Sequence, residues 1–335
     1  MSSSIINIGL IGLGRIGKMH AINLHKNLPM FNLRRIVDLA PDLNFISGLD
    51  KTHHSTDVDD IILDNTIDAV VVCSPTPTHC DIIKKCAANN KHVFCEKPIS
   101  FYENEIQEIM QIMNDQKIFI QVGLNRRFDQ DFVLAKEKVD AGMVGDIQTI
   151  HITNHDASIP SFKFLKSSGG MLFDLCIHDF DMLNFITGSQ IKEIYVNGDV
   201  FIEPKLKDVG DIDNVLITIE LESGVLCSID SSRQTHYGYD QRIEIFGSKG
   251  LLAVENKSDS LYHFSDDKNT KTSKIKYSFI ERYKESYVTE LEYFYKCIIS
   301  DTKPIVGPEN ILSAIKVASA GVESLNNNFP QRVKK

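Results

Sequence analysis

A glycine-rich segment near the start of the chain places the tightest constraint on the fold. The stretch GLIGLGRIGKMH follows the apolar run IINI and holds four glycines within nine residues. A glycine inside a regular element costs roughly 0.5–1 kcal/mol relative to alanine, so the backbone there must require the missing side chains. Gly12, Gly14 and Gly17 fit the pattern G-x-G-x-x-G. Such glycines permit a tight turn, the approach of a pyrophosphate and close packing of the following helix.

The sequence downstream supplies the context that this motif needs. A second strand-like segment, residues 32–39, contains Asp38, about 20 residues beyond Gly17, where a carboxylate hydrogen-bonds the hydroxyls of an adenosine ribose. This context favours a dinucleotide site over a tight turn without a ligand. Because the carboxylate would repel a 2′-phosphate, NAD is favoured over NADP. Arg34 and Arg35 could accept such a phosphate, but within a strand we expect them to point away from it.

The pattern of apolar residues divides the chain in two. Up to about residue 123, buried-strand patterns alternate with helical patterns, which predicts a parallel sheet with right-handed crossovers. Beyond it, strands follow one another with turn signals between them. The predicted fold class is therefore α/β. We expect residues 1–123 to form an NAD-binding Rossmann domain and residues 124–335 to form an α+β domain with a large, mostly antiparallel sheet. Two C-terminal helices, near 283–299 and 309–325, could pack back on the first domain.

Several local patterns make sharper predictions. Residues 170–187 predict one helix that ends at Gly188, a residue type favoured just after a helix. Ser100 and Glu103 match the S-x-x-E capping box ahead of another helix. The Lys- and Ser-rich stretch near 265–276 predicts an exposed loop.

Composition narrows the classes of partner and compartment. The net charge is −9 and no long basic run occurs, which argues against nucleic acid and anionic membranes. No apolar run approaches the ~18 residues of a membrane span, and the N-terminal residues lack the basic start of a signal peptide. The seven cysteines form no C-x-x-C pair, which favours reduced thiols over a zinc site or a redox dithiol. We therefore expect a cytoplasmic protein without a metal.

Two motifs lie where strands of the first domain should end, at the edge where open α/β sheets bind ligands. CSPTPTH, residues 73–79, predicts a stiff loop along the cofactor, with an ordinary loop as the alternative. In EKP, Lys97 could point at the nicotinamide and donate to a substrate oxygen, with an ordinary surface lysine as the alternative. The predicted cofactor contacts are Gly12, Gly14, Arg15, Ile16, Gly17, Asp38, Ser74, Pro75, Thr76, His79 and Glu96.

The segment FDLCIHDFDM places Asp174 and His178 four residues apart, on one face of a predicted helix. A carboxylate that orients an imidazole makes it a competent general base. Asp181 falls on the same side of the helix and could also contact His178. A surface salt bridge is the alternative. A metal site is disfavoured because no third ligand has a matching spacing.

Taken together, these stretches resemble the Gfo/Idh/MocA oxidoreductases over nearly the whole chain. The stretches GLGRIGKMHA, PTPTH, CEKPIS, NRRFD, SGGMLFDLCIHDFDM and ERYKESYVTEL occur in the family's order. FDLCIHDFDM is most similar to the inositol 2-dehydrogenase branch. The resemblance implies an NAD-dependent dehydrogenase that oxidises a secondary hydroxyl of a cyclic polyol, with myo-inositol and 2-keto-myo-inositol (scyllo-inosose) as the expected pair. It implies that Lys97, Asp174 and His178 are catalytic.

The resemblance also implies substrate contacts and an assembly. Its implied substrate-binding residues are Arg127, Asn154, His155, Tyr237 and Tyr283. For the two tyrosines, a packed core or interface position is the alternative. The stretch NHDASIP varies within the branch, so the substrate is less constrained than the chemistry. A homo-oligomer, dimer or tetramer, is implied. A dehydrogenase of another sugar or sugar derivative and a non-catalytic NAD-binding regulator are the competing functions.

Overall fold

The computed structural model describes residues 5–334 and divides them into two compact units. The first comprises the chain up to Asn125 together with Tyr287–Leu312. The second comprises Arg126–Ser286 and the chain from Ser313 onward. The later two points of division fall within two helices, α11 (Lys284–Ser300) and α12 (Pro308–Asn327).

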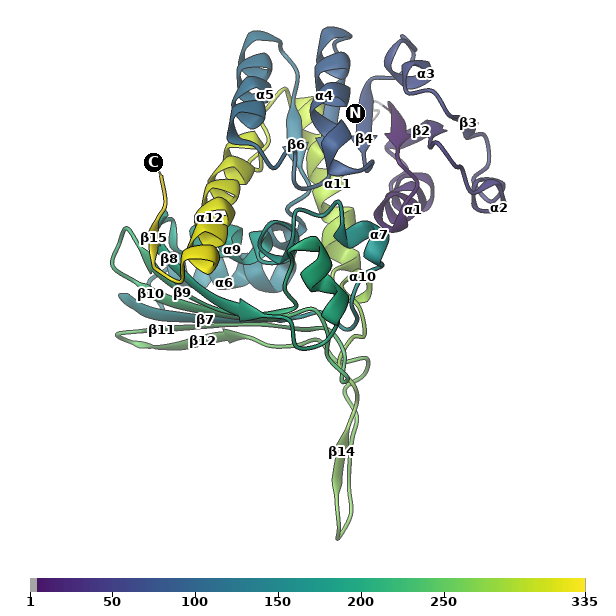
Figure 1. Cartoon of the computed structure of the whole chain (residues 1–335). Helices are drawn as coiled ribbons and strands as arrows, with labels where there is room; N and C mark the ends of the chain where they lie inside the picture. Colours follow the sequence, from purple (N-terminus) through teal and green to yellow (C-terminus); the bar gives the residue numbers. More distant parts are fainter. Residues whose placement is uncertain (1–4, 335) are drawn as a thin grey trace. The chain divides into compact units, whose positions relative to one another are not determined.

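The first unit is built on a six-stranded parallel sheet with the order β3-β2-β1-β4-β5-β6 (Figure 1). This is the strand order of a doubly wound dinucleotide-binding fold, so the Rossmann prediction is confirmed. The continuous apolar run of β4 is buried along its whole length, as expected of a strand covered on both faces. The sequence pattern does not predict the edge strand β3, whose residues are HHS. The strands are β1 (Ile6–Ile11), β2 (Phe31–Val37), β3 (His53–Ser55), β4 (Ala69–Val72), β5 (His92–Cys95) and β6 (Ile120–Val122).

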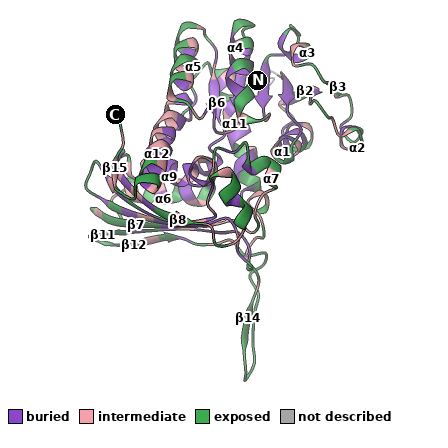
Figure 2. Ribbon diagram, in the orientation of Figure 1, coloured by how far each residue is buried: buried purple, intermediate pink, exposed green. Residues whose placement is uncertain are grey.

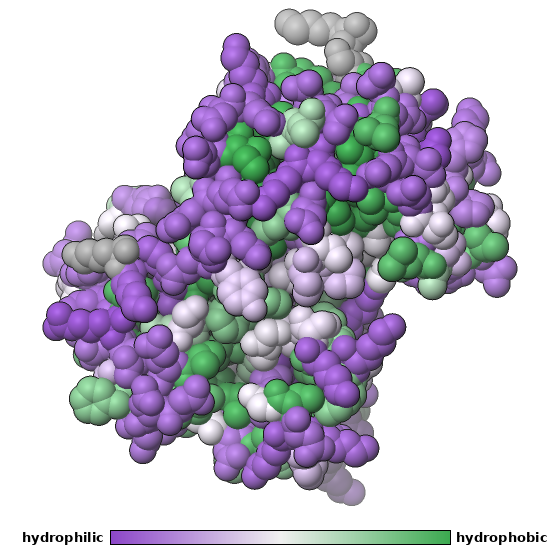
Figure 3. Space-filling model, turned by 45° about the horizontal axis from the view of Figure 1, so that its top comes forward, coloured by the Kyte–Doolittle hydropathy of each residue, from purple (hydrophilic) through white to green (hydrophobic). Residues whose placement is uncertain are grey.

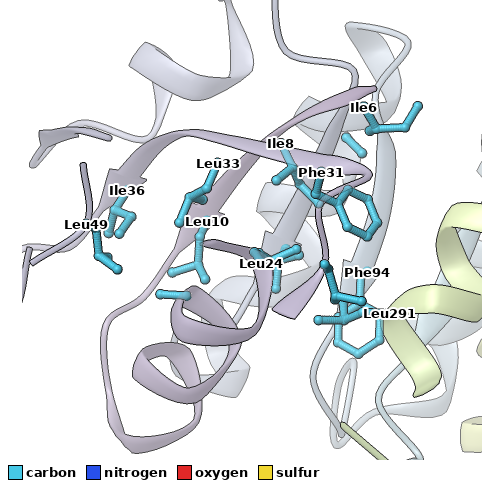
Figure 4. Packing of buried hydrophobic residues seen from close by; sticks show 14 of the residues in the cluster. Ile6, Ile8, Leu10, Leu24, Phe31, Leu33, Ile36, Leu49, Phe94 and Leu291 are labelled. Carbon is cyan, nitrogen blue, oxygen red and sulfur yellow. The ribbon is translucent and has the colours of Figure 1, made fainter. Parts of the chain in front are cut away.

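Helices cover both faces of this sheet. Leu24 and Leu291, the latter from α11, share one buried apolar cluster with Leu10 of β1 (Figure 4). The neighbouring Gly9 points to the opposite face, where an added Cβ would lie 2.6 Å from Ile61. The helices of this unit are α1 (Arg15–Ile22), continued by η1 (Asn23–Asn27), then α2 (Leu43–Ile46), α3 (Asp59–Ile62), η2 (Thr76–Thr78), α4 (His79–Ala88) and α5 (Glu103–Asp115).

The second unit carries a seven-stranded sheet with the order β12-β11-β7-β10-β9-β8-β15. Its neighbouring strands are antiparallel except for the parallel pair β7 and β10, which confirms the prediction of a mostly antiparallel sheet. Helices α6, α9 and α12 lie along one face (Figure 1). The strands are β7 (Ile147–His155), β8 (Ile191–Asp199), β9 (Asn214–Leu221), β10 (Leu226–Ser232), β11 (Asp240–Gly247), β12 (Gly250–Val254) and β15 (Gln331–Arg332). The remaining helices are η3 (Asn125–Phe128), α6 (Gln130–Asp140), α7 (Phe162–Leu165), α8 (Met171–Asp174), α9 (Ile177–Thr187), η4 (Pro204–Val209) and α10 (Phe279–Arg282).

The prediction of a single helix over residues 170–187 is wrong. The segment forms two helices, α8 and α9, separated by Leu175 and Cys176. The N–H of Cys176 bonds to the carbonyl of Met171, five residues back, which interrupts the regular helical pattern. The predicted end is confirmed, because Gly188 adopts the left-handed conformation with φ +67°.

The predicted capping box is also wrong. Helix α5 begins at Glu103 and its N-cap is Tyr102, which makes no side-chain cap bond. Ser100 lies two residues earlier and donates its hydroxyl to Glu105 (2.5 Å), while it accepts the N–H of Tyr102 (3.0 Å). A serine at that position cannot serve the first turn in the way an N-cap residue does.

The surface carries one exposed hairpin and is mainly hydrophilic on the face that Figure 3 draws. The stretch predicted as an exposed loop forms a hairpin of β13 (His263–Ser265) and β14 (Thr270–Thr272), and both strands are fully exposed (Figure 2). The face drawn in Figure 3 is mainly hydrophilic, with smaller apolar patches between. Over residues 5–334, no helix has the length and apolarity needed to cross a membrane.

Candidate active site

The glycine turn between β1 and α1 has the geometry that its sequence predicts. Gly12 adopts φ +94°, and an added Cβ would lie 2.5 Å from the main-chain nitrogen of Ser74. A Cβ on Gly17 would lie 2.0 Å from the carbonyl oxygen of Gly12, so a larger residue would prevent α1 from packing this close to the turn. A Cβ on Gly14 would meet nothing within 4 Å. The space before the first turn of α1, which begins with Arg15 and Ile16, is therefore open to a phosphate.

Asp38 follows β2 directly and faces this turn. Its Oδ2 accepts the N–H of Leu13 (2.6 Å), and its Oδ1 accepts the N–H of Ala40 (2.8 Å). These bonds fix the carboxylate beside the open space at Gly14. Arg35 lies 3.8 Å from Asp60, in an ion pair with that carboxylate. The residues therefore fit an adenosine ribose with free hydroxyls, as in NAD.

His79 joins two loops at the carboxyl edge of the sheet. Its ring is buried, with Nε2 2.7 Å from the carbonyl oxygen of Ser74 and Nδ1 2.8 Å from that of Pro98. Burial lowers the pKa of this imidazole, although both carbonyls act in the opposite direction. Both ring nitrogens are thus engaged by the main chain. His79 thus holds the loop of Ser74, Pro75 and Thr76, which remains partly exposed, and its role as a cofactor contact stays a prediction.

The EKP turn follows β5. Lys97 is partly exposed. The main-chain N–H of Lys97 lies 3.3 Å from Oε2 of Glu96. Glu96 Oε1 lies 2.8 Å from Nε2 of His20. The carboxylate predicted as a cofactor contact therefore bonds to a histidine of α1.

In the second unit, Asp174 ends α8 and His178 lies in the first turn of α9. Between residues 171 and 183, only Phe173, Asp174 and His178 retain partial exposure. The predicted spacing therefore spans a junction between two helices, and both polar side chains reach the surface of an otherwise buried segment.

A buried arginine fixes the carboxylate of Asp174, and sequence reasoning missed it. Arg233 Nη1 lies 3.2 Å from Asp174 Oδ2, and Arg233 Nη2 lies 3.0 Å from Asp211 Oδ2. Asp211 also accepts the N–H of Met171 (2.8 Å) at the start of α8. This carboxylate thus anchors both the helix start and the arginine. The stretch SSRQT carries no motif that could have identified Arg233.

A second buried pair lies behind α9. Arg126 Nη1 donates to Asp179 (2.5 Å), whose other carboxylate oxygen accepts from Asn154 Nδ2 (2.6 Å). Burial raises the pKa of Asp179, although Arg126 and Asn154 oppose the shift. Arg126 Nη2 also lies 3.3 Å from the hydroxyl of Tyr239. The sequence pattern singled out neither Arg126 nor Tyr239, although Arg127 and Tyr237 lie within two residues of them.

The other predicted substrate residues do not form one group. Arg127 makes a bidentate ion pair with Asp181 (2.8 and 2.7 Å). Asp181, which the sequence suggested as a contact of His178, therefore bonds to an arginine. Asn154 and His155 are neighbours on β7 and point to opposite faces of the sheet. Asn154 is fully buried toward α9. Their roles as substrate contacts stay predictions.

The two predicted tyrosines also separate. Tyr237 is 56 % exposed, donates to Asp240 (2.8 Å) and lies 3.4 Å from His155 Nδ1. Tyr283 is 2 % exposed and packs edge-on against Tyr239, with ring centroids 5.9 Å apart. Within the described residues, its buried hydroxyl has no hydrogen-bond partner. Tyr237 thus groups with His155, and Tyr283 groups with the Arg126 network.

Comparison with known proteins agrees with these observations. Residues 6–124 match the model of an oxidoreductase family with an NAD-binding Rossmann fold, and residues 132–253 match the GFO/IDH/MocA C-terminal domain. The chain is 37 % identical to the uncharacterized oxidoreductase YrbE of Bacillus subtilis, covering 98 % of this chain and 97 % of the relative. It is also 37 % identical to a myo-inositol 2-dehydrogenase of Thermotoga maritima, covering 96 % of each.

A solved structure extends the likeness to the fold. Scyllo-inositol dehydrogenase from Lactobacillus casei, with bound NAD(H) and scyllo-inositol, superposes with a TM-score of 0.92 at 28 % identity. The match covers 98 % of this chain and 99 % of that structure. Because the family models match both units and the glycine turn and Asp38 agree with them, the chain belongs to the Gfo/Idh/MocA family of NAD-dependent oxidoreductases.

Proposed function

We propose that the chain oxidises a secondary hydroxyl of a cyclic polyol to a ketone, with myo-inositol as the first substrate and 2-keto-myo-inositol as its product. Residues 1–123 hold NAD, and residues 124–335 hold the substrate. The observation that carries the proposal is the partial exposure of Asp174 and His178 within a buried segment, with Asp174 fixed by Arg233. The inositol dehydrogenases among its relatives support the choice of substrate class.

In the proposed reaction, His178 removes the proton of the substrate hydroxyl. Asp174 orients the imidazole and favours its protonated form, while Arg233 pairs with that carboxylate and holds it in place. Lys97 donates a hydrogen bond to the reacting oxygen and stabilises its developing negative charge. Bound NAD supplies the hydride acceptor at nicotinamide C4. The open space at Gly14 and the carboxylate of Asp38 support binding of the dinucleotide at the turn between β1 and α1.

The proposal is tested by assaying the purified chain with NAD and a panel of inositol isomers and pyranoses. We expect NADH to form, fastest with myo-inositol. Turnover of pyranoses or sugar derivatives alone would select the other sugar dehydrogenases. Binding of NAD with no turnover on any polyol or sugar would select a regulator.

Asp38 sets the preference between NAD and NADP in this proposal. We expect Asp38→Asn to weaken NAD binding about tenfold or more, because a hydrogen bond to a charged group contributes about 1.5–3 kcal/mol. NADP binding should improve relative to NAD, since the repelling charge is gone. Fluorescence titration with the reduced cofactors measures both affinities, and Asp115→Asn, an exposed carboxylate at the end of α5, is the control. An unchanged ratio of affinities would contradict the assignment.

The open face of the second unit's sheet supports a homo-oligomer. Large apolar side chains are exposed on four of its strands, which is unusual for a solvated sheet face. They are Leu216, Leu226, Phe246 and Leu251, exposed by 63 %, 58 %, 48 % and 60 %. We infer that a second copy of the chain covers this face, giving a dimer or a tetramer. Light scattering on size-exclusion chromatography tests it, and a monomer at micromolar concentration would contradict it.

The state of the cysteines indicates the cellular compartment in which the protein works. All seven are unpaired, and six of them are buried. Burial raises the pKa of Cys80, Cys86 and Cys227 to about 12 each, which keeps these thiols protonated and unreactive. Unpaired thiols in this number favour a reducing compartment, so we infer that the protein works in the cytoplasm.

A further inference from the structure

Three titratable side chains meet behind the EKP turn, and the proposed mechanism uses none of them. His20 comes from α1, Glu96 follows β5, and Glu290 comes from α11; all three belong to the first unit. One nitrogen or oxygen atom from each lies within 4.8 Å of the other two. His20 and Glu290 are fully buried, and the side chain of Glu96 is 13 % exposed.

The hydrogen bonds inside this cluster leave Glu290 unsatisfied as a carboxylate. His20 Nε2 bonds to Glu96 Oε1 (2.8 Å). Within the described residues, neither carboxyl oxygen of Glu290 has a hydrogen-bond partner, and neither does Nδ1 of His20. A buried, unpaired negative charge is very unfavourable, so such a group takes up a proton instead.

The surroundings of Glu290 act in the same direction. Burial raises the pKa of Glu290 well above its usual range, and the nearby charge of Glu96 raises it further. Burial and the charge of Glu96 raise the pKa of the Cys73 thiol as well. The titratable groups that face Glu290 are therefore His20 of α1, Cys73 after β4 and Glu96 after β5. None of these three groups is a fixed cation, and His20 already bonds to Glu96.

The cluster is connected directly to Lys97. Glu96 precedes Lys97 in the chain, and its Oε2 lies 3.3 Å from the Lys97 N–H. Gly123, after β6, leaves room for the same carboxylate, because an added Cβ would lie 3.0 Å from Glu96 Oε2. On the other side of the turn, His79 contacts the carbonyl of Pro98. The position of the Glu96 carboxylate thus helps to set the position of the turn.

We propose that His20, Glu96 and Glu290 form a positioning cluster in which a neutral Glu290 carboxyl and the His20 ring share the charge of Glu96 and thereby hold Lys97 in place. The inference rests on the proposed function, in which Lys97 bonds the reacting oxygen. A divalent cation held by the same three side chains is the competing explanation. The existing bond from His20 Nε2 to Glu96 disfavours it, because a cation would need that same pair of atoms.

The test compares Glu290→Gln with Glu290→Leu in the full chain. Glutamine keeps the size and the donor of a neutral carboxyl, whereas leucine keeps the size and removes the donor. We expect Glu290→Gln to retain kcat and its pH profile. Glu290→Leu should lose about 10- to 100-fold in kcat, since an error of about 1 Å in a positioned group can cost 10²-fold. The KM for NAD should stay unchanged in both variants. A Glu290→Gln variant as impaired as Glu290→Leu would overturn the proposal, as would a fully active Glu290→Leu.

Two measurements are independent of turnover. Infrared difference spectroscopy of the parent against Glu290→Gln should show the carbonyl band of a protonated carboxylic acid at neutral pH. If the band is present but no polyol or sugar is oxidised, the proposed function fails while the neutral carboxyl stands. If the band is absent, the cluster proposal fails whatever the substrate is. Elemental analysis of the purified parent should find no stoichiometric divalent metal, and a metal lost in both variants would establish the cation site instead.

Discussion

Replacing His178 by alanine is expected to lower kcat/KM for the preferred polyol about 10²–10⁴-fold, the range contributed by a positioned general base. The loss should appear mainly in kcat, because the imidazole acts on a proton that moves only in the transition state. NAD binding should be unchanged, since the glycine turn and Asp38 belong to the first unit. Initial rates of NADH formation and a separate cofactor titration measure the two effects.

His263 provides the matched control. It is an exposed histidine on β13, and His263→Ala should leave the rate unchanged. Asp174→Asn extends the test, because it keeps the side chain's size but removes the charge that Arg233 pairs with. We expect it to lower kcat less than His178→Ala and to shift the acidic limb of the pH profile to lower pH, because the base loses the carboxylate that favours its protonated form. A His178→Ala variant that matches the His263→Ala control would rule out the imidazole as the base.

Features fixed by neighbouring residues could be predicted from the sequence. The glycine turn is one, because an added Cβ on Gly17 would collide with the carbonyl oxygen of Gly12, only five residues earlier in the chain. The carboxylate at Asp38 is another, since it follows from the register of the next strand. The alternation of strands and helices in the first unit has the same local origin.

Features fixed by distant residues could not be predicted. Arg233 reaches Asp174 across 59 residues of sequence, and Arg126 reaches Asp179 across 53, with no motif to mark either arginine. Tyr237 is exposed, whereas Tyr239 is buried beside Arg126. This difference depends on tertiary packing, which the sequence does not show. The break between α8 and α9 likewise depends on a single displaced hydrogen bond at Cys176.

The Arg126–Asp179 pair should have the largest effect on stability. Arg126 is 3 % exposed and Asp179 is fully buried, so removing either partner leaves a charge in the interior. We expect Arg126→Met to lower the free energy of unfolding by about 3–5 kcal/mol, the usual cost of breaking a buried pair. Lys136→Met is the control, because its partner Asp140 is exposed and surface pairs contribute at most about 1 kcal/mol. Urea denaturation measures both.

The cause of that loss can be separated from lost packing. The double variant Arg126→Met with Asp179→Leu removes both charges, so it should recover most of the stability lost by Arg126→Met alone. The pH dependence has a definite sign. Burial already raises the pKa of Asp179, and losing Arg126 raises it further. Below that raised pKa the folded variant binds a proton that the unfolded chain does not, so its deficit relative to the parent should shrink as the pH falls. A deficit that stays constant with pH and persists in the double variant would mean that the arginine acts through packing, and that its charge contributes nothing to holding α9.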